Sequence, residues 1–405
     1  MIKSNYRIQS SKIIQFIFCV LTIYLFISCN GKNKSYEENN DQPLTIDSLL
    51  ALRYQQFLKY QVDSTAFPRS YNPKNKTIKK VPSSNWTSGF YAGALWQIFE
   101  LTGEETFKKK AEEWTAFIEK EKFNDRTHDM GFKVFCSFGN GLKHNNDNDY
   151  KDIIVKSAQT LSTRFDEKIG SIRSWDFGKE KWQFPVIIDN MMNLELLFEA
   201  TKISKDSSFH KLAVIHANTT LKNHFRPDHS TWHVLDYDTI SGDVRMRVTH
   251  QGINDDSAWA RGQAWAINGF TMAYRYTRDP KYLEQAKATA NFFINHKNLP
   301  EDGIPYWDFD DPAIPNSPRD VSAAAITASA LVELYEYTQD QTYLNYSKKV
   351  LNSLRSTNYI LPKEMKIPFI LDHSSGDYSQ KSEMDEPIIY GDYYFLQTAL
   401  RLKDL

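Results

Sequence analysis

The chain alternates between helix-length runs that are apolar throughout and helix-length runs that are apolar on one side. Four stretches repeat this order, beginning at Gly93, Asn193, Asn268 and Ser329. In each stretch an apolar run ends in a threonine and a short polar link. A second run then places apolar residues at i, i+3 and i+4, the spacing of one helix face. The threonines are Thr102, Thr201, Thr277 and Thr338. The pattern predicts four helical hairpins.

Similar periodicity predicts further helices outside these hairpins. They cover about residues 44–60, 131–142, 147–165 and 390–402, which brings the predicted total near twelve. Strand patterns are few, and the clearest is STWHVLDYD at residues 230–238.

The hairpins recur without a fixed period, whereas a solenoid keeps a constant short repeat. Long insertions rich in Trp, His, Asp and Gly separate them, and long loops in a compact domain are usually functional. We therefore expect an all-α fold, an (α/α)6 toroid of about six helical hairpins whose loops form a cleft at one end. An open helical scaffold that binds a partner protein is the alternative.

The first 43 residues have a different pattern. Lys3, Arg7 and Lys12 precede an apolar run over residues 13–27. About 15 apolar residues are few for a membrane span, and the order of basic, apolar and small residues is that of a signal peptide. The run ends at Ser28 and Cys29, which resembles a bacterial lipoprotein signal with a lipidated cysteine. A plain secretory signal is the alternative.

This pattern divides the chain into three parts. We expect a signal peptide over residues 1–29 with lipid on Cys29, a polar tether over 30–43 and one (α/α)6 domain over 44–405. The protein would be exported, to the periplasm or outer membrane of a Gram-negative bacterium, and would meet the membrane only through its lipid. Once Cys19 has left with the signal, Cys136 stands alone, so no internal disulfide is expected.

Composition excludes some functions and leaves others open. The formal net charge of -1 gives no electrostatic footprint for nucleic acid. No CxxC or HExxH motif occurs, so we expect no metal site and no cofactor. The 9 Trp, 22 Tyr and 25 Phe residues can fill a core or offer flat faces to sugar rings, and composition does not choose between them.

Two carboxylates are candidates for chemistry. Asp189 lies in FPVIIDNMMNLELLFEA among apolar neighbours, where burial would raise its pKa and let it donate a proton near neutral pH. Asp129 lies in RTHDMGF, and paired carboxylates are the working groups of most glycosidases. The alternatives are a first-turn acid at a helix start for Asp189 and a surface turn for Asp129.

The stretch DDSAWARGQAWAINGF, residues 255–270, is the strongest local pattern. Arg261 offers a donor fork for a carboxylate, and Trp259 and Trp265 offer stacking faces. Together they suit a sugar acid. The alternative is that Arg261 pairs internally with Asp255 or Asp256 while both Trp residues pack in the core.

Six motifs in order resemble the unsaturated glucuronyl hydrolases, glycoside hydrolase family 88. They are SNWTSGFYAGALW at 84–96, THDMGF at 127–132, IIDNMMNLELL at 187–197, THQG at 249–252, WARGQAW at 259–265 and PIIYGDYYFLQTAL at 387–400. The resemblance covers nearly the whole chain after the leader. It implies an (α/α)6 barrel and hydration of the C4=C5 double bond that lyases leave in a non-reducing-end uronic acid.

The resemblance also implies roles for particular residues. Asp189 falls on the general acid/base and Asp129 on the second carboxylate, often described as a nucleophile. Further positions look like substrate contacts or stacking platforms; they are Trp86, His233, Thr249, Gln251, Trp259, Arg261 and Trp265. The loop at 372–387 departs from the family pattern. Its Ser374, Ser375, Ser379 and Lys381 could serve a sulfate, but their spacing is not a clear match.

The sequence therefore predicts an exported hydrolase acting on unsaturated uronic-acid oligosaccharides derived from glycosaminoglycans, which releases 4-deoxy-5-keto-uronate. Rivals are an unsaturated rhamnogalacturonyl hydrolase acting on pectin fragments and, more weakly, a polysaccharide lyase. A non-catalytic glycan-binding lipoprotein is the rival from another class. The oligomeric state does not follow from the sequence.

Overall fold

Burial divides the helices into two kinds. Every residue is buried over residues 88–98 of α2, 260–273 of α8 and 321–334 of α10. In α3 and α11 the buried residues instead follow one helix face. A helix buried on all sides must be enclosed by others, whereas a one-sided helix covers a core. The apolar runs are thus inner helices and the amphipathic runs outer ones.

The computed structural model describes residues 44–145, 148–378 and 380–405, and residues 44–405 form one compact unit. The predicted leader, Cys29 and tether lie outside the described residues. The helices are α1 Ile46–Lys59, α2 Ser88–Thr102, α3 Glu105–Ala116, α4 Asn140–Leu142, α5 Asn148–Ser162, α6 Leu194–Ser204, α7 Ser207–Asn223, α8 Ala260–Thr277, α9 Pro280–Ile294, α10 Val321–Thr338, α11 Gln341–Leu354 and α12 Ile389–Lys403. A 3-10 helix, Glu119–Phe123, a π-helix, Gly131–Gly139, and a second 3-10 helix, Ile188–Asn193, complete the helical set.

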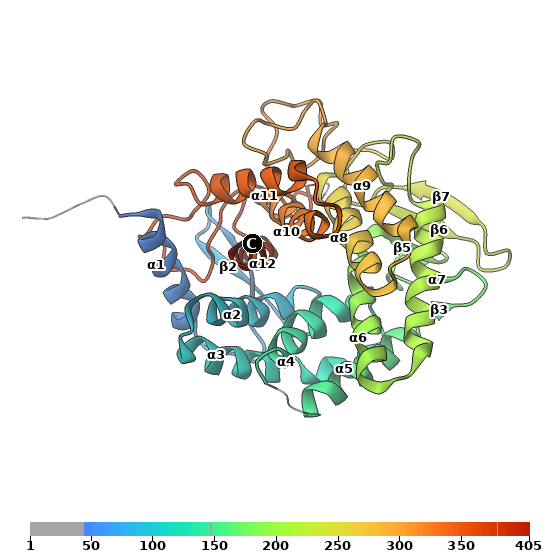
Figure 1. Ribbon diagram of the computed structural model, residues 1–405, viewed down its shortest axis with the longest axis horizontal. Helices are drawn as coiled ribbons and strands as arrows, with labels where there is room; N and C mark the ends of the chain where they lie inside the picture. The colour runs from blue at the N-terminus through green and yellow to red at the C-terminus, as the bar shows by residue number, and fades with distance from the viewer. Residues whose placement is uncertain (1–43, 146–147, 379) are drawn as a thin grey trace, which may run out of the picture. The chain divides into compact units, whose positions relative to one another are not determined.

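The inner helices close into a ring. α2 contacts the π-helix, which is followed around the ring by α6, α8, α10 and α12, and α12 packs back on α2. The outer helices α3, α7, α9 and α11 each pack on the inner helix that precedes them, while α5 covers α6 and the π-helix. Figure 1 shows the hairpins following one another around this ring. The predicted toroid of helical hairpins is confirmed, and an open scaffold is excluded because the ring closes.

The polar links of the hairpins explain the repeated threonine. Thr102, Thr277 and Thr338 are the last residues of their helices, and each hydroxyl donates to the carbonyl four residues earlier. The next residue adopts a left-handed conformation that ends the helix. In the second hairpin the predicted equivalent, Thr201, is wrong. Helix α6 continues to Ser204, whose hydroxyl donates to the Ala200 carbonyl and accepts from the Asp206 amide.

Short strands lie in the loops between the hairpins. The structure has β1 Phe67–Asn72 paired with β2 Thr77–Val81, and β3 Phe165–Asp166 paired with β4 Ser171–Ile172. A three-stranded antiparallel sheet joins β5 Pro185–Ile187, β6 Val234–Tyr237 and β7 Val244–Val248. The strand predicted over 230–238 is β6. The β1–β2 hairpin was missed because TIKKV presents mostly polar residues to solvent.

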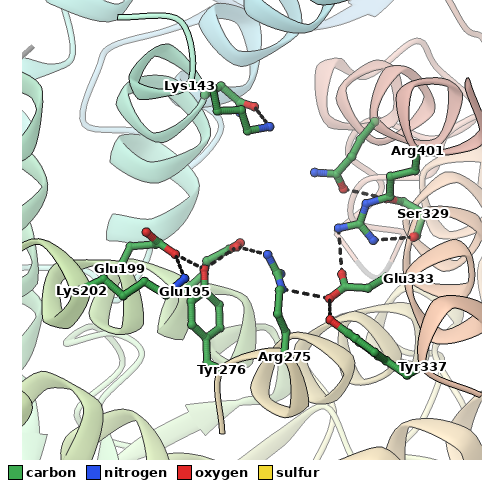
Figure 2. Close-up of polar contacts among 12 residues, drawn as sticks. Lys143, Glu195, Glu199, Lys202, Arg275, Tyr276, Ser329, Glu333, Tyr337 and Arg401 are labelled. Atoms are coloured by element: carbon green, nitrogen blue, oxygen red, sulfur yellow. Dashed lines mark hydrogen bonds and ion pairs between the residues drawn. The ribbon is translucent and has the colours of Figure 1, made fainter. Parts of the chain in front are cut away.

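A polar network joins α6 to the C-terminal halves of α8, α10 and α12. Arg275 contacts Glu195 at 2.8 Å and Glu333 at 2.9 Å, and Arg401 contacts Glu333 at 2.9 Å. Tyr276 donates to Glu199. Figure 2 shows these side chains converging from facing helices. Because Glu333 is buried, its two arginine partners stabilise its charge and tie this end of the ring together.

No helix in the described ranges is both long and apolar enough to cross a membrane.

Candidate active site

The segments at the N-terminal ends of α2, the π-helix, α6, α8 and α12 meet at a cavity of about 690 Å³. Trp86 and Asp129 precede α2 and the π-helix, Asp189 lies just before α6, and Arg261 and Tyr390 lie in the first turns of α8 and α12; all five line the cavity. Helix N-termini carry partial positive charge from the backbone dipoles. The arrangement therefore favours a negatively charged ligand.

A strand pair positions Asp189. Strand β5 ends at Ile187, which pairs with Val234 of β6, and the Ile188 amide donates to the His233 carbonyl at 3.1 Å. The chain then turns into the 3-10 helix, and Asp189 lies in its first turn. Its carboxyl points at the cavity with one oxygen, Oδ2, buried and without a hydrogen-bond partner. Asp189 is thus a first-turn acid that also faces the site.

Burial raises the pKa of Asp189 to about 6. The positive charges of His128 and Arg261 act against burial, and the negative charge of Asp129 adds to it. Burial, rather than repulsion between the two carboxylates, is the main cause. A carboxyl that keeps its proton near neutral pH can act as a general acid.

Asp129 has the opposite environment. Burial disfavours its charge, but the charge of His128 and hydrogen bonds from His128 and Thr127 outweigh it and lower the pKa of Asp129 below its usual value. The His128 Nε2 lies 3.1 Å from Oδ1, and the Thr127 hydroxyl donates to Oδ2 at 2.6 Å. The cavity therefore holds one carboxyl disposed to keep its proton and one disposed to stay ionised. Two titratable groups separated in this way are typical of acid/base sites.

The asparagines of IIDNMMN fix the two carboxylate segments. The Asn193 Oδ1 accepts from the Phe132 amide at 3.1 Å, which joins the segment after Asp129 to the segment after Asp189. The Asn190 amide donates to the Ile172 carbonyl at 2.8 Å. Approach is close here, since a Cβ on Gly131 would lie 2.7 Å from the Asn193 Cα. The glycine of THDMGF is therefore required by packing.

His233 lies behind Asp189 in a fixed tautomer. Its Nδ1 accepts from the backbone amides of His250 and Gln251, both at 3.1 Å. Burial, followed by the charges of His250 and Arg261, lowers the pKa of His233 well below 6.5, so the ring is neutral. A neutral ring whose Nδ1 accepts carries its proton on Nε2. That nitrogen lies 3.7 Å from the Asp189 Oδ2 and can approach when the carboxyl ionises.

Arg261 is held from several sides. Its guanidinium contacts Asp320 at 2.7 Å and donates to the Ser375 and Gly376 carbonyls, and it stacks 4.6 Å from the Trp259 ring. The internal partner is Asp320 rather than Asp255 or Asp256. Arg261 still lines the cavity.

Not all predicted contact residues reach the cavity. Trp86, Gln251 and Arg261 line it, as do both carboxylates. His233, Thr249, Trp259 and Trp265 are not among its lining residues, and their roles as substrate contacts stay predictions. Trp259 and Trp265 are 3% and 0% exposed because they begin a helix enclosed on all sides. The Thr249 hydroxyl accepts from the Gly252 amide at 2.7 Å and shapes the loop that binds His233.

Other lining residues were missed. They are Arg69, Arg126, His128, Trp175, Phe177, His250 and Tyr390. Trp175 and Phe177 come from the insertion SWDFGKEKWQFP, whose aromatic content marked it as functional without indicating which rings face the site. Arg69 comes from the unpredicted strand β1, and its partner, Glu383, lies 314 residues away along the chain.

The sulfate-loop residues lie elsewhere. Ser374 and Ser375 are buried, and Lys381 lines a separate cavity, so none of these three lines the site; Ser379 is outside the described residues. Within the described ranges, no group of three or more His, Cys, Asp or Glu residues is placed to hold a metal ion.

Comparison with known proteins identifies the family. The model described as Glycosyl Hydrolase Family 88 matches residues 61–298, and that of Glycosyl hydrolase family 76 matches residues 213–384. An unsaturated glucuronyl hydrolase of Formosa agariphila is 54% identical over 97% of this chain and 99% of its own length. The chain belongs to glycosyl hydrolase family 88.

Two more distant relatives agree with this family assignment. An unsaturated chondroitin disaccharide hydrolase of Streptococcus agalactiae is 32% identical over 81% of this chain and 83% of its own. A crystal structure of an unsaturated glucuronyl hydrolase specific for heparin superposes with a TM-score of 0.85, at 41% identity, over 89% of this chain and 97% of that one. This family 88 chain is therefore an enzyme of the unsaturated glucuronyl hydrolase type with the helical toroid fold.

Proposed function

We propose that this hydrolase removes the unsaturated uronic acid from the non-reducing end of glycosaminoglycan di- and oligosaccharides made by lyases. The observation that carries the proposal is the pair of carboxyls with opposite pKa shifts in one cavity, Asp189 raised and Asp129 lowered. The substrate is a vinyl ether, an electron-rich double bond between C4 and C5 that needs an acid.

Asp189 supplies the proton. Its carboxyl O–H adds the proton to C4, the C4=C5 electrons form the new C–H bond, and positive charge develops at C5 and the ring oxygen. The resulting Asp189 carboxylate is stabilised by the His233 Nε2–H, because Nε2 lies 3.7 Å from the Asp189 Oδ2. The ionised Asp129 adds a second negative charge beside the developing cation.

Water completes the reaction. It adds to C5 and gives up a proton to the Asp189 carboxylate, which restores the acid. The product is a hemiketal at C5, which opens to a C5 ketone and leaves a hemiacetal at C1. The hemiacetal collapses to an aldehyde as its C1 hydroxyl loses a proton, and the C1–O bond to the next sugar breaks, so that sugar leaves with its own oxygen and takes up a proton. Each bond broken is matched by one formed, and Asp189 returns to its starting state.

The electrostatics of the cavity suit an anionic sugar. The helix N-termini point at it, and Arg126 lines it without an ion pair among the described residues. The other two arginines that line the cavity already form ion pairs. Arg69 pairs with Glu383 at 2.6 Å and Arg261 with Asp320 at 2.7 Å. The relatives named for chondroitin and heparin substrates support the glycosaminoglycan class.

A panel of unsaturated disaccharides from chondroitin, heparin and rhamnogalacturonan tests the proposal. Loss of the ultraviolet absorbance of the conjugated double bond reports turnover. We expect turnover of a glycosaminoglycan disaccharide, and its loss in Asp189→Asn with binding retained. Turnover of the pectin fragment alone would reassign the substrate. Binding without turnover of any member by wild type would support the glycan-binding alternative.

We also propose that the enzyme is exported as a lipoprotein anchored through Cys29. The basic, apolar and Ser-Cys order of residues 3–29 supports this. Mass spectrometry of the protein from membranes should find lipid on an N-terminal Cys29. A soluble product of Cys29→Ala together with a lipidated wild type would agree, and an unmodified cysteine in the wild type would refute the anchor.

A further inference from the structure

A ridge of aromatic residues separates the active-site cavity from a second hollow. Trp175, Asp176 and Phe177 line both the 690 Å³ cavity and a neighbouring one of about 310 Å³. Trp175 and Phe177 stack at 5.1 Å with only 10° between their planes. Phe177 is nevertheless 57% exposed, although a large apolar side chain gains by burial. A stacked aromatic face left open at the rim of a sugar site is a surface on which a sugar ring can pack.

Cations line the far side of the ridge. Lys179 and Arg173 face the second cavity, and Lys179 forms no ion pair within the described part of the chain. Arg173 forms an ion pair with Asp176 at 3.5 Å, and Asp176 forms a second, closer ion pair with Arg164 at 2.8 Å. One carboxylate therefore faces two arginines. The hollow therefore carries net positive charge.

The backbone holds this wall in place. The amides of Lys181 and Trp182 both donate to the Gly178 carbonyl at 2.9 Å, which makes a tight turn, and Gly178 itself has φ of 63°. Trp182 packs edge-on against Trp175 at 5.6 Å. The turn thus positions the backbone at Lys179, a residue that lines the second cavity and not the cavity that holds Asp189.

We propose that the second cavity is an outer subsite for an anionic sugar beyond the first two residues of the substrate. Its size suits one sugar ring. An oligosaccharide with its unsaturated end at Asp189 would cross the ridge over Phe177 and place a carboxylate or sulfate beside Lys179. The inference rests on the proposed function for the direction of the chain, and it makes the enzyme prefer oligosaccharides longer than disaccharides.

Equilibrium binding tests the subsite without requiring turnover. The Asp189→Asn protein is titrated calorimetrically with an unsulfated unsaturated chondroitin disaccharide, the matching tetrasaccharide and a sulfated tetrasaccharide. The tetrasaccharides should bind about 3- to 10-fold more tightly than the disaccharide, as expected for one exposed charge contact and one packed ring. Comparing the two tetrasaccharides distinguishes recognition of the carboxylate from recognition of the sulfate.

Variants locate the effect. Adding Lys179→Ala or Phe177→Ala should bring the Kd ratio of disaccharide to tetrasaccharide toward one. The matched controls are Lys348→Ala, an exposed lysine on α11, and Phe123→Ala, which is 62% exposed and lines neither cavity. Equal Kd values for disaccharide and tetrasaccharides, or a ratio that Lys179→Ala and Phe177→Ala leave unchanged, would overturn the subsite. Failure of wild type to hydrolyse any unsaturated disaccharide would instead overturn the proposed function.

Discussion

Replacing Asp189 by Asn should stabilise the folded protein at neutral pH while abolishing activity. The pKa of Asp189 is raised from 3.8 to about 6 by burial. A group whose pKa is raised on folding binds its proton more tightly in the folded state, so its stabilising contribution is complete below pH 3.8 and is lost as pH rises through about 6. At pH values well above 6 the wild-type free energy of unfolding is therefore about 3 kcal/mol lower than it would be without the charge of buried Asp189. Asn has nearly the same shape and carries no charge.

Urea unfolding of wild type and Asp189→Asn at several pH values measures this effect. Any constant effect of the new amide cancels when the difference between the two proteins is followed with pH. The advantage of Asp189→Asn should grow by about 2 kcal/mol from about pH 4.5 to about pH 7.5, while kcat falls about 10³-fold. A difference that does not change with pH would refute the buried, protonated Asp189.

Three further predictions follow from the site and the ring. First, kcat/KM should fall about tenfold per pH unit above about pH 6, because Asp189 loses its proton there. It should also fall at acidic pH, below the ordinary carboxyl pKa of 3.8, as Asp129 takes up a proton. A kcat/KM that stays constant from about pH 5 to about pH 8 would contradict this prediction. Second, Asn193→Ala should leave the buried Phe132 amide without its hydrogen bond and lower the free energy of unfolding in urea by about 1–3 kcal/mol. It should also lower kcat, because the segments that carry the two carboxylates are no longer joined. An unchanged kcat would show that Asn193 contributes to stability alone. Third, Glu333→Gln should lower the free energy of unfolding by about 3 kcal/mol, because Arg401 and one side of Arg275 lose their counter-charge. The value of kcat/KM should stay within about twofold of wild type. Unchanged stability would show that this network does not stabilise the ring.

Local pattern predicted the helices well because burial in this fold follows the sequence period. Inner helices are enclosed on all sides and have apolar sequences throughout, whereas outer helices have one apolar face. The order of an apolar run and an amphipathic run therefore indicates a hairpin. The second hairpin was misaligned because Ser204 can end a helix as Thr does, and only the helix length distinguishes it from Thr201.

The carboxylates could also be predicted, but their supports could not. An acid among apolar residues is expected to have a raised pKa once it is buried, and the motifs pointed to Asp129 as a second carboxylate. The structure places Asp189 and Asp129 in one cavity, and their catalytic roles stay predictions. Which aromatic residue faces the cavity depends on contacts across the ring, so the sequence did not indicate that Trp175 lines the cavity or that Trp265 is buried away from it. Arg261 pairs with Asp320, 59 residues away, and no local pattern contains that distance.

Proton transfer from Asp189 to C4 is the central claim, and product analysis in heavy water tests it most directly. Wild-type enzyme is given an unsaturated chondroitin disaccharide in D2O, and the earliest product is followed by NMR. The account predicts one deuterium at C4 of the released 4-deoxy-5-keto-uronate in a single orientation, because a fixed acid delivers it from one face. Release of an unsaturated uronic acid with its double bond intact, or deuterium in both orientations from the first turnover, would contradict it.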